Sequence, residues 1–459
     1  MDISEKLLEK YNRPVPRYTS YPPANHFNDE ISGDKYLEMV RLSNTRQPSN
    51  IAVYIHIPFC HKICFYCGCN SCKLNKGDEY LEYHEALKKE IDIITGEIDD
   101  SRKVTQIHFG GGTPNSIPVR YLSEIIGMIT SGFALADDAE IAIECNPALL
   151  DKEYIDSLKE AGFNRFSLGI QDFKEEVLKM VNRDPSALPV GDLIEYIRKG
   201  SDNIAVNLDF IYGLPGQTAD SFRKTMATAA ELRPDRLVTF SYAHVPWLKK
   251  NQKILEKYDL PSPRQKVDMF MEAYKLLRKS GYMPVGLDHY VLPGDELYRA
   301  VKENLLHRNF QGYCTRHTTG QVYAFGVSAI SQLEMGYFQN TKSVKEYKES
   351  LKKSELPVEK GRILDEKEKV MREVITQLMC NKHIDWKTMG EITGTGAETV
   401  KSIVRLDNEA LRGFAADGLL EFNDDYISVT EKGSMFIRNI AASLDPAYQP
   451  EKNKYSKSV

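Results

Sequence analysis

The sequence has no stretch of about 20 consecutive apolar residues, the length that a membrane-spanning helix requires. It also has no excess of basic residues, because 60 lysines and arginines stand against 65 aspartates and glutamates, for a net charge of −5. General binding to nucleic acid or to a membrane surface is therefore not expected, although a local basic pocket can still hold an anion. The opening residues MDISEKLLEKYNRP lack the apolar core of a secretory signal, so we expect a cytoplasmic protein.

Cysteine is scarce, and the eight cysteines are not spread out as a disulfide framework would be. Five of them fall within thirteen residues, namely Cys60, Cys64, Cys67, Cys69 and Cys72. The other three, Cys145, Cys314 and Cys380, stand alone, and we expect them to be packing residues. Clustering of this kind in a long chain indicates metal or redox chemistry.

Short apolar runs alternate with helical patterns through the first two-thirds of the sequence, with little sign of hairpins. Strands are predicted at 51–57, 104–110, 141–145, 164–170, 205–213, 236–242 and 283–289. Helices are predicted at 79–97, 120–132, 151–161, 174–182, 217–232 and 263–280. Runs that are apolar on both faces are typical of parallel strands covered by helices. We therefore predict a βα-repeat sheet, either open and doubly wound or closed into a full or partial barrel.

The two ends of the chain have other patterns. In residues 1–45, NRPVPRYTSYPPANHF is too rich in proline for regular structure, and we predict an ordered arm or lid over the barrel mouth. Residues 46–365 would form the barrel and its extension. In 366–459, helical patterns at 366–380 and 396–415 are followed by a predicted β-hairpin and a last helix, MFIRNIAASL. This order suggests a winged-helix-like domain, and its mixed charge favours packing over nucleic-acid binding.

Polar side chains recur where the predicted strands end. They are His56, Cys60, the glycines at 110–112, Glu144, Cys145, Gln171, Asp209 and His244. Because ligand sites of βα barrels and open α/β sheets lie at the carboxyl ends of the strands, these side chains are expected to converge on one pocket.

The segment HIPFCHKICFYCGCN places Cys60-x3-Cys64-x2-Cys67 just after a predicted strand. Three thiolates on one short loop can bind three irons of a cubane and leave the fourth iron without a protein ligand. A zinc site would require four ligands, commonly from two separated Cys-x2-Cys pairs, and no second pair occurs downstream of this cysteine cluster. A redox Cys-x2-Cys motif would account for Cys64 and Cys67 but not for Cys60. We therefore predict a [4Fe–4S] cluster, with zinc and thiol redox chemistry as the alternatives.

This cysteine spacing at a strand end resembles the radical S-adenosylmethionine (SAM) superfamily. There the open iron chelates SAM, and an electron from the reduced cluster splits a C–S bond to release a 5′-deoxyadenosyl radical. Tyr66, directly before the third cysteine, resembles the aromatic residue that packs near the adenine. The run from Gly110 to Pro114 resembles the superfamily's site for the methionyl amino group, where glycines let the backbone present N–H groups to a ligand.

Three further stretches, YNRPVPRYTSYP, Cys67-x-Cys69 and HRNFQGY, resemble the oxygen-independent coproporphyrinogen III oxidase family. The resemblance covers nearly the whole chain, through NRFSLGIQDF, VNRD, LDFIYGLPGQT, SYAHVP and GVSAIS. It implies an α/β fold: a partial (β/α) TIM-like radical SAM barrel, an N-terminal arm and a mostly helical, winged-helix-like C-terminal domain that closes the mouth.

The resemblance also implies an enzyme of heme biosynthesis. Such an enzyme oxidatively decarboxylates two propionates of coproporphyrinogen III to vinyl groups, without oxygen, and gives protoporphyrinogen IX. The implied cofactors are a [4Fe–4S] cluster and one or two SAM molecules. The expected partners are this substrate, an electron donor and an electron acceptor, and we expect a monomer. Radical opening of the heme ring and heme chaperoning remain alternatives, although both kinds of protein lack the Cys-x-Cys ending and the full arm and HRNFQGY phrases.

Site residues follow from the resemblance by position. Cys60, Cys64 and Cys67 match the cluster ligands. A first SAM site matches Tyr54, Gly111, Glu144 and Ile330. A second SAM site matches Tyr66, Gly112, Thr113, Gln171, Arg183, Asp209 and Ala243. Glu144 and Asp209 suit ribose hydroxyls or an ammonium group, and Arg183 suits a carboxylate; salt bridges and an ordinary surface charge are the structural alternatives.

Several other residues also have predicted roles. Cys69 is expected to lie near the cluster without being its fourth ligand, and Cys72 is expected to be incidental. Arg13, Arg17 and Arg308 are candidates for binding propionates, with structural salt bridges as the alternative. His56 and His307 are expected to be hydrogen-bonding scaffold, and Phe310 and Gln311 to line the pocket.

Overall fold

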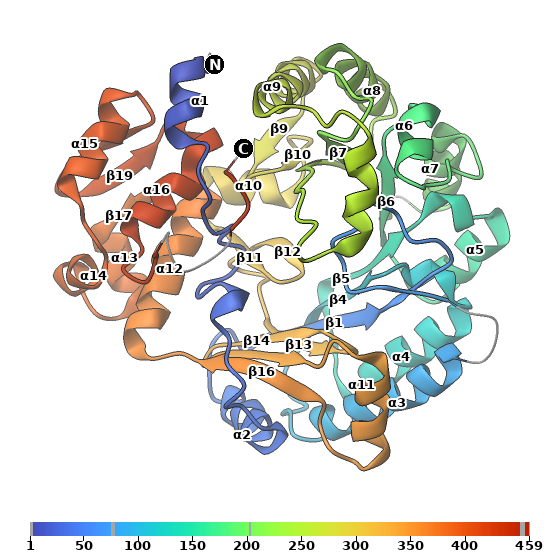
Figure 1. Ribbon diagram of the computed structural model, residues 1–459. Coiled ribbons are helices and arrows are strands. Elements are labelled where there is room, and N and C mark those ends of the chain that lie inside the picture. Colours follow the sequence, from blue (N-terminus) through green and yellow to red (C-terminus); the bar gives the residue numbers. More distant parts are fainter. Residues whose placement is uncertain (1–2, 75–78, 202, 450–454, 459) are drawn as a thin grey trace.

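The computed structural model describes residues 3–74, 79–201, 203–449 and 455–458. Its centre is a 12-stranded sheet in the order β16-β15-β14-β13-β1-β4-β5-β6-β7-β8-β10-β9. This sheet curves into an open barrel with helices on its outside (Figure 1). Its parallel strands are β1 (Ile51–Ile57), β4 (Val104–Gly111), β5 (Leu135–Cys145), β6 (Arg165–Gln171), β7 (Ala205–Tyr212), β8 (Arg236–Ser241) and β13 (Gln321–Phe325).

The outer layer consists of helices that connect these strands. They are α3 (Glu79–Thr95), α4 (Val119–Gly132), α5 (Lys152–Glu160), α6 (Glu175–Met180), α7 (Val190–Arg198), α8 (Ala219–Glu231) and α9 (Pro263–Lys279). Strand β7 shows why the sequence folds this way. Val206, Leu208 and Phe210 are fully buried in the main hydrophobic core, whereas Asp209 and Ile211 line a cavity inside the barrel. Because successive side chains of a strand point to opposite faces of the sheet, the apolar residues pack under the helices and Asp209 faces the interior of the barrel.

The predicted βα-repeat barrel is confirmed, and six predicted strands correspond to β1 and β4–β8. The seventh, at 283–289, is wrong. Its residues divide between β9 (Met283–Val285) and β10 (His289–Val291), which pair antiparallel, with a turn at 286–288.

Little sign of hairpins was expected in the first two-thirds of the chain, where β9 and β10 form one; the strands beyond that part were not predicted. After β13 the sheet continues as an antiparallel meander of β14 (Ile330–Leu333), β15 (Gly336–Asn340) and β16 (Val358–Ile363). Helix α7 was not predicted either, although it buries Leu193, Ile194 and Ile197 at helical spacing.

Smaller elements surround the barrel. They are η1 (Ala24–His26), β2 (Phe59–Cys60), β3 (Cys72–Lys73), η2 (Pro114–Ser116), η3 (Pro147–Leu149), η4 (Lys250–Lys257), α10 (Glu296–Lys302), β11 (Leu306–Asn309), β12 (Gly312–Thr315) and α11 (Val344–Lys352). Among the residues that the structure describes, no helix has both the length and the apolar character needed to cross a bilayer.

The last part of the chain is a helical unit with a small sheet. Its helices are α12 (Glu366–Asn381), α13 (Trp386–Thr393), α14 (Ala397–Ile403), α15 (Asn408–Ala416), η5 (Gly433–Phe436) and α16 (Ile437–Leu444). Strands β17 (His383–Asp385), β19 (Tyr426–Val429) and β18 (Leu420–Phe422) form the sheet, which contains the predicted hairpin. The pattern at 396–415 forms two helices, because Asp407 caps the second one.

The first 45 residues have two different sets of neighbours. Helix α1 (Glu5–Tyr11) and the segment after it belong to the hydrophobic cluster of the C-terminal helices. Helix α2 (Gly33–Ser43) instead packs its buried residues into the barrel core. Figure 1 accordingly shows the blue N-terminal segment running between the red helices and the barrel.

Candidate active site

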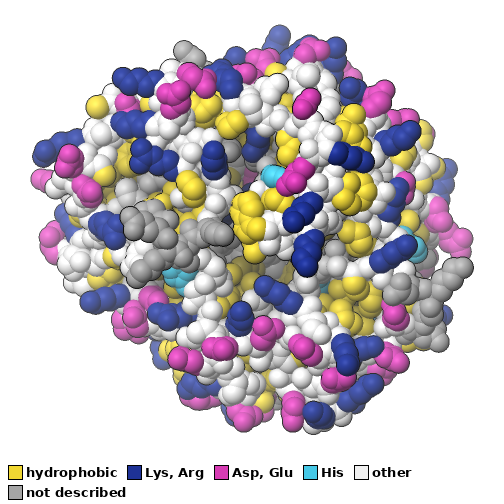
Figure 2. Space-filling model, in the orientation of Figure 1, with side chains coloured by type: hydrophobic (Ala, Val, Ile, Leu, Met, Phe, Trp, Pro, Cys, Tyr) yellow, Lys and Arg dark blue, Asp and Glu magenta, His cyan; other side chains and the backbone are white. Residues whose placement is uncertain are grey.

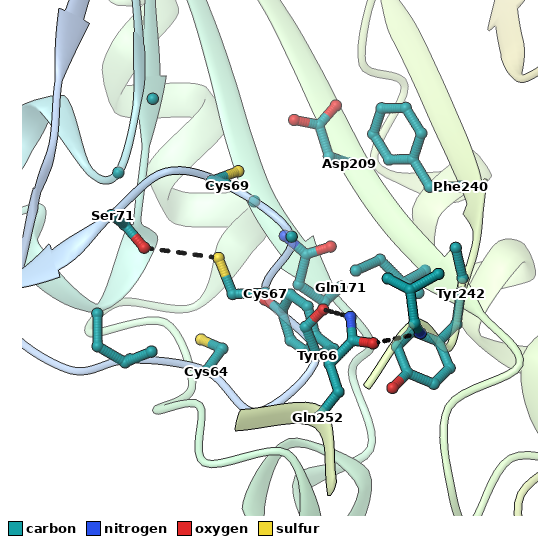
Figure 3. A pocket seen from close by; sticks show the side chains of 18 of the residues that line it. Cys64, Tyr66, Cys67, Cys69, Ser71, Gln171, Asp209, Phe240, Tyr242 and Gln252 are labelled. Carbon is teal, nitrogen blue, oxygen red and sulfur yellow. Dashed lines mark hydrogen bonds between the residues drawn. The ribbon is translucent and has the colours of Figure 1, made fainter. Parts of the chain in front are cut away.

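A cavity of about 740 Å³ lies where the parallel strands of the barrel end. Of the residues matched to cofactor sites, twelve line it: Cys60, Cys64, Tyr66, Cys67, Gly111, Gly112, Thr113, Glu144, Gln171, Arg183, Asp209 and Ala243. Eleven of them come from the cysteine loop and from the carboxyl-terminal parts of β4, β5, β6, β7 and β8, and Arg183 comes from the loop after α6; Figure 3 shows several of the twelve around one space. The expected convergence at the strand ends is therefore observed.

Cys60, Cys64 and Cys67 each have a polar side chain close to the sulfur atom. The Thr113 hydroxyl donates to Cys60 Sγ at 3.2 Å, and Arg183 Nη1 donates to Cys64 Sγ at 3.6 Å. Burial raises the pKa of the Cys60 thiol to about 11 despite the Thr113 hydrogen bond. Donors of this kind stabilise negative charge on sulfur, so the loop suits thiolate ligands. Within the described ranges, no three His, Cys, Asp or Glu side chains are arranged to hold a single metal ion.

Cys69 changes the pKa of Cys67, an effect that the spacing of the cysteines did not predict. Hydrogen bonding with Cys69 is the main cause that lowers the pKa of Cys67 to about 6, and it raises the pKa of Cys69 itself. Ser71 Oγ lies 3.8 Å from Cys67 Sγ and lowers the pKa further (Figure 3). Cys69 is therefore the neighbour that most lowers the pKa of the third cysteine.

The backbone of the cysteine loop is held by a segment distant in sequence, which we call the η4 clamp and which comprises Lys249, Asn251 and Gln252. Asn251 Nδ2 donates to the carbonyls of Cys64 and Phe65 at 3.1 Å and to that of Cys67 at 3.4 Å. Gln252 Nε2 donates to the Tyr66 carbonyl at 2.9 Å, as Figure 3 shows, and Lys249 Nζ donates to the Cys69 carbonyl at 2.7 Å. Five carbonyls of one loop are thus fixed by three side chains.

The glycines after β4 are required by close packing. Gly111 has a φ of +111°, and a Cβ there would lie 2.6 Å from the His56 ring. A Cβ on Gly112 would lie 2.5 Å from the Pro58 carbonyl oxygen. Gly112 N in turn donates to the Ile57 carbonyl at 2.8 Å, so this turn packs directly against the strand that leads to the cysteines.

Glu144, at the end of β5, is oriented by two donors. His108 Nε2 lies 3.1 Å from its Oε1, and the Gly111 backbone N–H donates to its Oε2 at 3.3 Å. Burial would lower the pKa of His108, but the hydrogen bond to Glu144 and its negative charge outweigh burial and raise that pKa. Glu144 therefore presents a fixed carboxylate to the cavity.

Asp209, inside β7 and three residues before its end, accepts a hydrogen bond from Ser167 Oγ at 2.7 Å. Burial raises the pKa of Asp209 to about 7, and the nearby charge of Glu144 contributes. This carboxyl group can thus exchange a proton near neutral pH.

Gln171, at the end of β6, and Arg183, in the loop after α6, also line the cavity. Gln171 has a φ of +69°, unusual for a side-chain-bearing residue, and its Oε1 is buried with no partner in the protein. Arg183 donates through Nη2 to the Gly169 carbonyl and through Nη1 to Cys64. Burial would lower the pKa of Arg183, but Tyr66 and Cys64 raise it. An unpaired acceptor and a fixed cation therefore face the same cavity.

Two of the fourteen predicted residues do not line the cavity. Tyr54 lies beneath it and donates from its hydroxyl to His56 Nδ1 at 3.2 Å, while His56 Nε2 donates to the Asn70 carbonyl at 2.9 Å. Burial lowers the pKa of His56, so it is the hydrogen-bonding scaffold that was predicted. Ile330 lies on β14, packed against a cluster that contains Phe27 and Tyr337.

The other predicted residues agree with the structure only in part. Phe310 packs edge-on against Tyr337 at 5.7 Å between ring centroids, and neither it nor Gln311 is among the residues that line the cavity. Arg17 lines it, but Arg308 lines a separate cavity. His307 Nδ1 is buried without a partner, so that atom is not hydrogen-bonding scaffold. Cys145 and Cys380 are buried in hydrophobic clusters, as expected of packing residues.

Sequence reasoning missed an apolar rim of the cavity, formed by Phe240, Trp247 and Leu248. Their exposed fractions are 36%, 53% and 70%. The segment SYAHVPWLKK carried a detectable signal, because large apolar residues next to lysines outside a strand or helix pattern are typical of a binding surface.

The chain matches the Radical SAM superfamily model over residues 54–229 and the HemN C-terminal domain model over residues 364–436. The oxygen-independent coproporphyrinogen III oxidase of Synechocystis sp. is 38% identical over 455 residues, which cover 99% of this chain and 97% of that protein. The Escherichia coli protein of the same name is 38% identical over 454 residues, covering 97% and 95%. The solved structure of coproporphyrinogen III oxidase (HemN) from Escherichia coli, described as a radical SAM enzyme, has a TM-score of 0.88 at 36% identity and covers 98% of this chain and 100% of that chain.

Proposed function

The chain belongs to the oxygen-independent coproporphyrinogen III oxidases of the radical SAM superfamily, and we propose that the cavity at its strand ends is where coproporphyrinogen III is decarboxylated. The reaction converts two propionates to vinyl groups in heme biosynthesis. The observation that carries the assignment to this cavity is that Cys60, Cys64 and Cys67 line it together with the ends of five successive strands.

The residues present fit a [4Fe–4S] cluster and SAM. We propose the three thiols as the cluster ligands, because thiolates are the ligands that such clusters take. Glu144 and the Gly111–Thr113 backbone are proposed to hold SAM, whose ammonium and hydroxyl groups donate to a carboxylate. When bound, the reduced cluster supplies the electron that splits SAM into methionine and the radical that removes a hydrogen atom from the propionate.

The second set of matched residues has two proposed uses. Tyr66, Gln171, Asp209 and Ala243 also line the cavity and are proposed to contact a second SAM or the substrate itself. Gln171 Oε1 needs a donor, and Asp209 can supply or accept a proton. These residues bind and orient; none of them could remove the unactivated propionate hydrogen as a proton.

The cavity mouth suits a large apolar ring with carboxylate arms. The rim residues Phe240, Trp247 and Leu248 are proposed to contact the tetrapyrrole, while Arg17 and Lys62, which also line the cavity, are proposed to attract its carboxylates. Figure 2 shows hydrophobic side chains at the centre of this face with lysines and arginines beside them. An apolar rim with nearby cations is the combination that this substrate requires.

Electron balance implies two further partners. Each propionate loses a hydrogen atom, carbon dioxide and one more electron, so a reductant must reduce the cluster and an acceptor must take the last electron. We propose that both are separate molecules and that the chain acts as a cytoplasmic monomer.

Anaerobic incubation of the reconstituted protein with coproporphyrinogen III, reductant and SAM tests the function. We expect a tricarboxylic intermediate, protoporphyrinogen IX and 5′-deoxyadenosine. Stoichiometric heme binding without product would favour a heme chaperone, and cleavage of added heme would favour a ring-opening enzyme.

The ligand assignment has a matched test within the same loop. Cys64→Ala is expected to abolish the cluster absorption and activity, because it removes one of three iron ligands. Cys72→Ala, which alters a cysteine on β3 that does not line the cavity, is expected to retain both. Retained cluster in the Cys64 variant would refute the assignment.

A further inference from the structure

A second cavity, of about 130 Å³, lies where the arm, β11, the strands β13 to β15 and helix α12 meet. Figure 1 shows the blue arm passing between α12 and the β11–β12 hairpin at this place. The volume corresponds to about four water molecules at the density of the liquid, which is enough for a small ion but not for a tetrapyrrole. We call it the arm cavity.

Buried polar atoms without a partner concentrate around the arm cavity. Thirteen such side-chain atoms occur among the described residues, and six of them belong to residues that line this cavity. The six atoms without a hydrogen-bond partner are His307 Nδ1, Arg308 Nε, Arg316 Nε, Arg316 Nη2, Gln332 Oε1 and Glu334 Oε2, of which Glu334 Oε2 has an ion pair with Arg46 at 4.0 Å. Leaving each such group unpaired costs about 1–3 kcal/mol, so a cluster of them points to a bound partner.

Arg316 shows which partner fits. Its Nη1 is used by Glu373 at 3.0 Å, whereas Nε and Nη2, the two nitrogens of one guanidinium edge, have no partner. That edge is a fork that matches two oxygens of a carboxylate or phosphate. Arg236 uses the same edge elsewhere in this protein, with Nε and Nη2 at 2.7 and 3.2 Å from the two oxygens of Asp295.

The charge around the arm cavity also favours an anion. Its lining contains three arginines, Arg308, Arg316 and Arg372, and two glutamates, Glu334 and Glu373. Lys369 lies 3.4 Å from Glu334 and partly neutralises it from outside. Burial, together with the charges of Arg316 and Arg372, lowers the pKa of His307 to about 4, so His307 does not add a positive charge at neutral pH.

We propose that the arm cavity is a binding site for one small oxyanion, held by the free edge of Arg316 with Arg308 beside it. The bound ion joins the arm, the β11 strand and α12, and it lies among the three arginines of the lining. A protonated phosphate can also donate to Gln332 Oε1. Two sources share this chemistry: free phosphate, and the carboxylate of a propionate side chain, which rests on the proposed function.

Thermal unfolding of the full-length protein in inorganic phosphate, in propionate and in chloride at matched ionic strength tests this. We expect a saturable rise of Tm in phosphate or propionate that chloride does not produce. Tighter binding of phosphate would identify a free ion as the occupant, and tighter binding of propionate a side-chain carboxylate. No substrate or cluster chemistry enters, so failure here is independent of the proposed function.

Single substitutions test whether the rise of Tm with anions comes from the arm cavity. Arg316→Gln is expected to weaken the anion response at least tenfold. Arg362→Gln is the matched control, because Arg362 also pairs with a glutamate of α12, Glu368 at 2.6 Å, but lies outside the arm cavity. If Arg316→Gln does not fold, Arg308→Lys provides a second test, with a weaker response expected. An equal response in chloride, or an unchanged response in the folded variants, would overturn the proposal.

Discussion

At the scale of single residues, position in the fold changes the chemistry of ordinary side chains. Asp209 is the clearest case, because burial beside Glu144 raises its pKa to about 7 while Ser167 supplies only one hydrogen bond. Its place at a strand end was predictable from the sequence. Its altered acidity was not, because that depends on neighbours from three other strands. Likewise the cavity position of Tyr66 could be predicted from the motif, whereas that of Tyr54, whose hydroxyl is directed to His56, could not.

The raised pKa of Asp209 predicts a pH dependence of stability. An unfolded aspartate has a pKa of about 3.9, below that of Asp209 in the folded protein. The folded state therefore keeps its full stability below about pH 4 and loses part of it as the pH rises through about 7. Asp209→Asn removes this loss. Between pH 5 and 8.5, urea unfolding of the cluster-free variant should therefore gain about 2 kcal/mol relative to the parent protein. A stability difference that does not change with pH would contradict the assignment.

Gly112 predicts a steric effect. Gly112→Ala would place a methyl group 2.5 Å from the Pro58 carbonyl oxygen, so we expect a loss of about 2 kcal/mol or more in unfolding free energy and reduced iron content. Gly127→Ala is the control, because that glycine lies inside α4 with open space around it, and a gain of about 0.5–1 kcal/mol is expected. Equal effects of the two substitutions would show that the turn after β4 is not tightly packed.

At the scale of secondary-structure elements, the strands and helices that can be predicted are those whose buried residues form a recognisable local sequence pattern. Strands β1 and β4–β8 are apolar runs covered by helices, and each was found. The β14–β16 meander was not, because its burial depends on tertiary hydrogen bonds. Asn340 at the end of β15 is 3% exposed only because its amide donates to Glu90 and to the Gly326 carbonyl. Such a polar residue indicates a loop when read locally.

The η4 clamp predicts an effect on cluster retention that is separate from stability. Asn251→Leu removes the amide nitrogen that contacts three carbonyls of the cysteine loop, and we expect lower iron content and faster cluster loss to a chelator. The melting temperature of the cluster-free protein should change little, because the loop lies outside the main core. Lys253→Ala, an exposed change in the same η4 segment, is the control. Unchanged iron content in the Asn251 variant would mean that the clamp does not position the loop.

At the scale of the whole molecule, the N-terminal segment and the C-terminal helices form one unit beside the barrel. The hydroxyls of Tyr18 and Tyr21 both donate to Asp445, at 2.9 and 2.8 Å, and Arg438 donates to the carbonyls of Val15 and Pro16. The sequence indicated an ordered arm from its tyrosines and prolines. It could not identify the partner, since the contacts join residues more than 400 positions apart.

This arrangement predicts the behaviour of the arm. Asp445 is 2% exposed, and Asp445→Ala leaves two buried tyrosine hydroxyls unpaired, so we expect a loss of about 2–4 kcal/mol and faster proteolysis near residues 12–24. Asp424→Ala, at an exposed position between β18 and β19, should change neither. Unchanged proteolysis in the Asp445 variant would show that the arm is held by other contacts.

The most direct measurement of the central claim follows one hydrogen atom. Coproporphyrinogen III carrying deuterium at the propionate β-carbons is incubated anaerobically with the reduced, cluster-loaded protein and SAM, and the 5′-deoxyadenosine formed is analysed by mass spectrometry. We expect one deuterium in the 5′-deoxyadenosine formed with each vinyl group. Vinyl products accompanied by unlabelled 5′-deoxyadenosine, or by none, would contradict it.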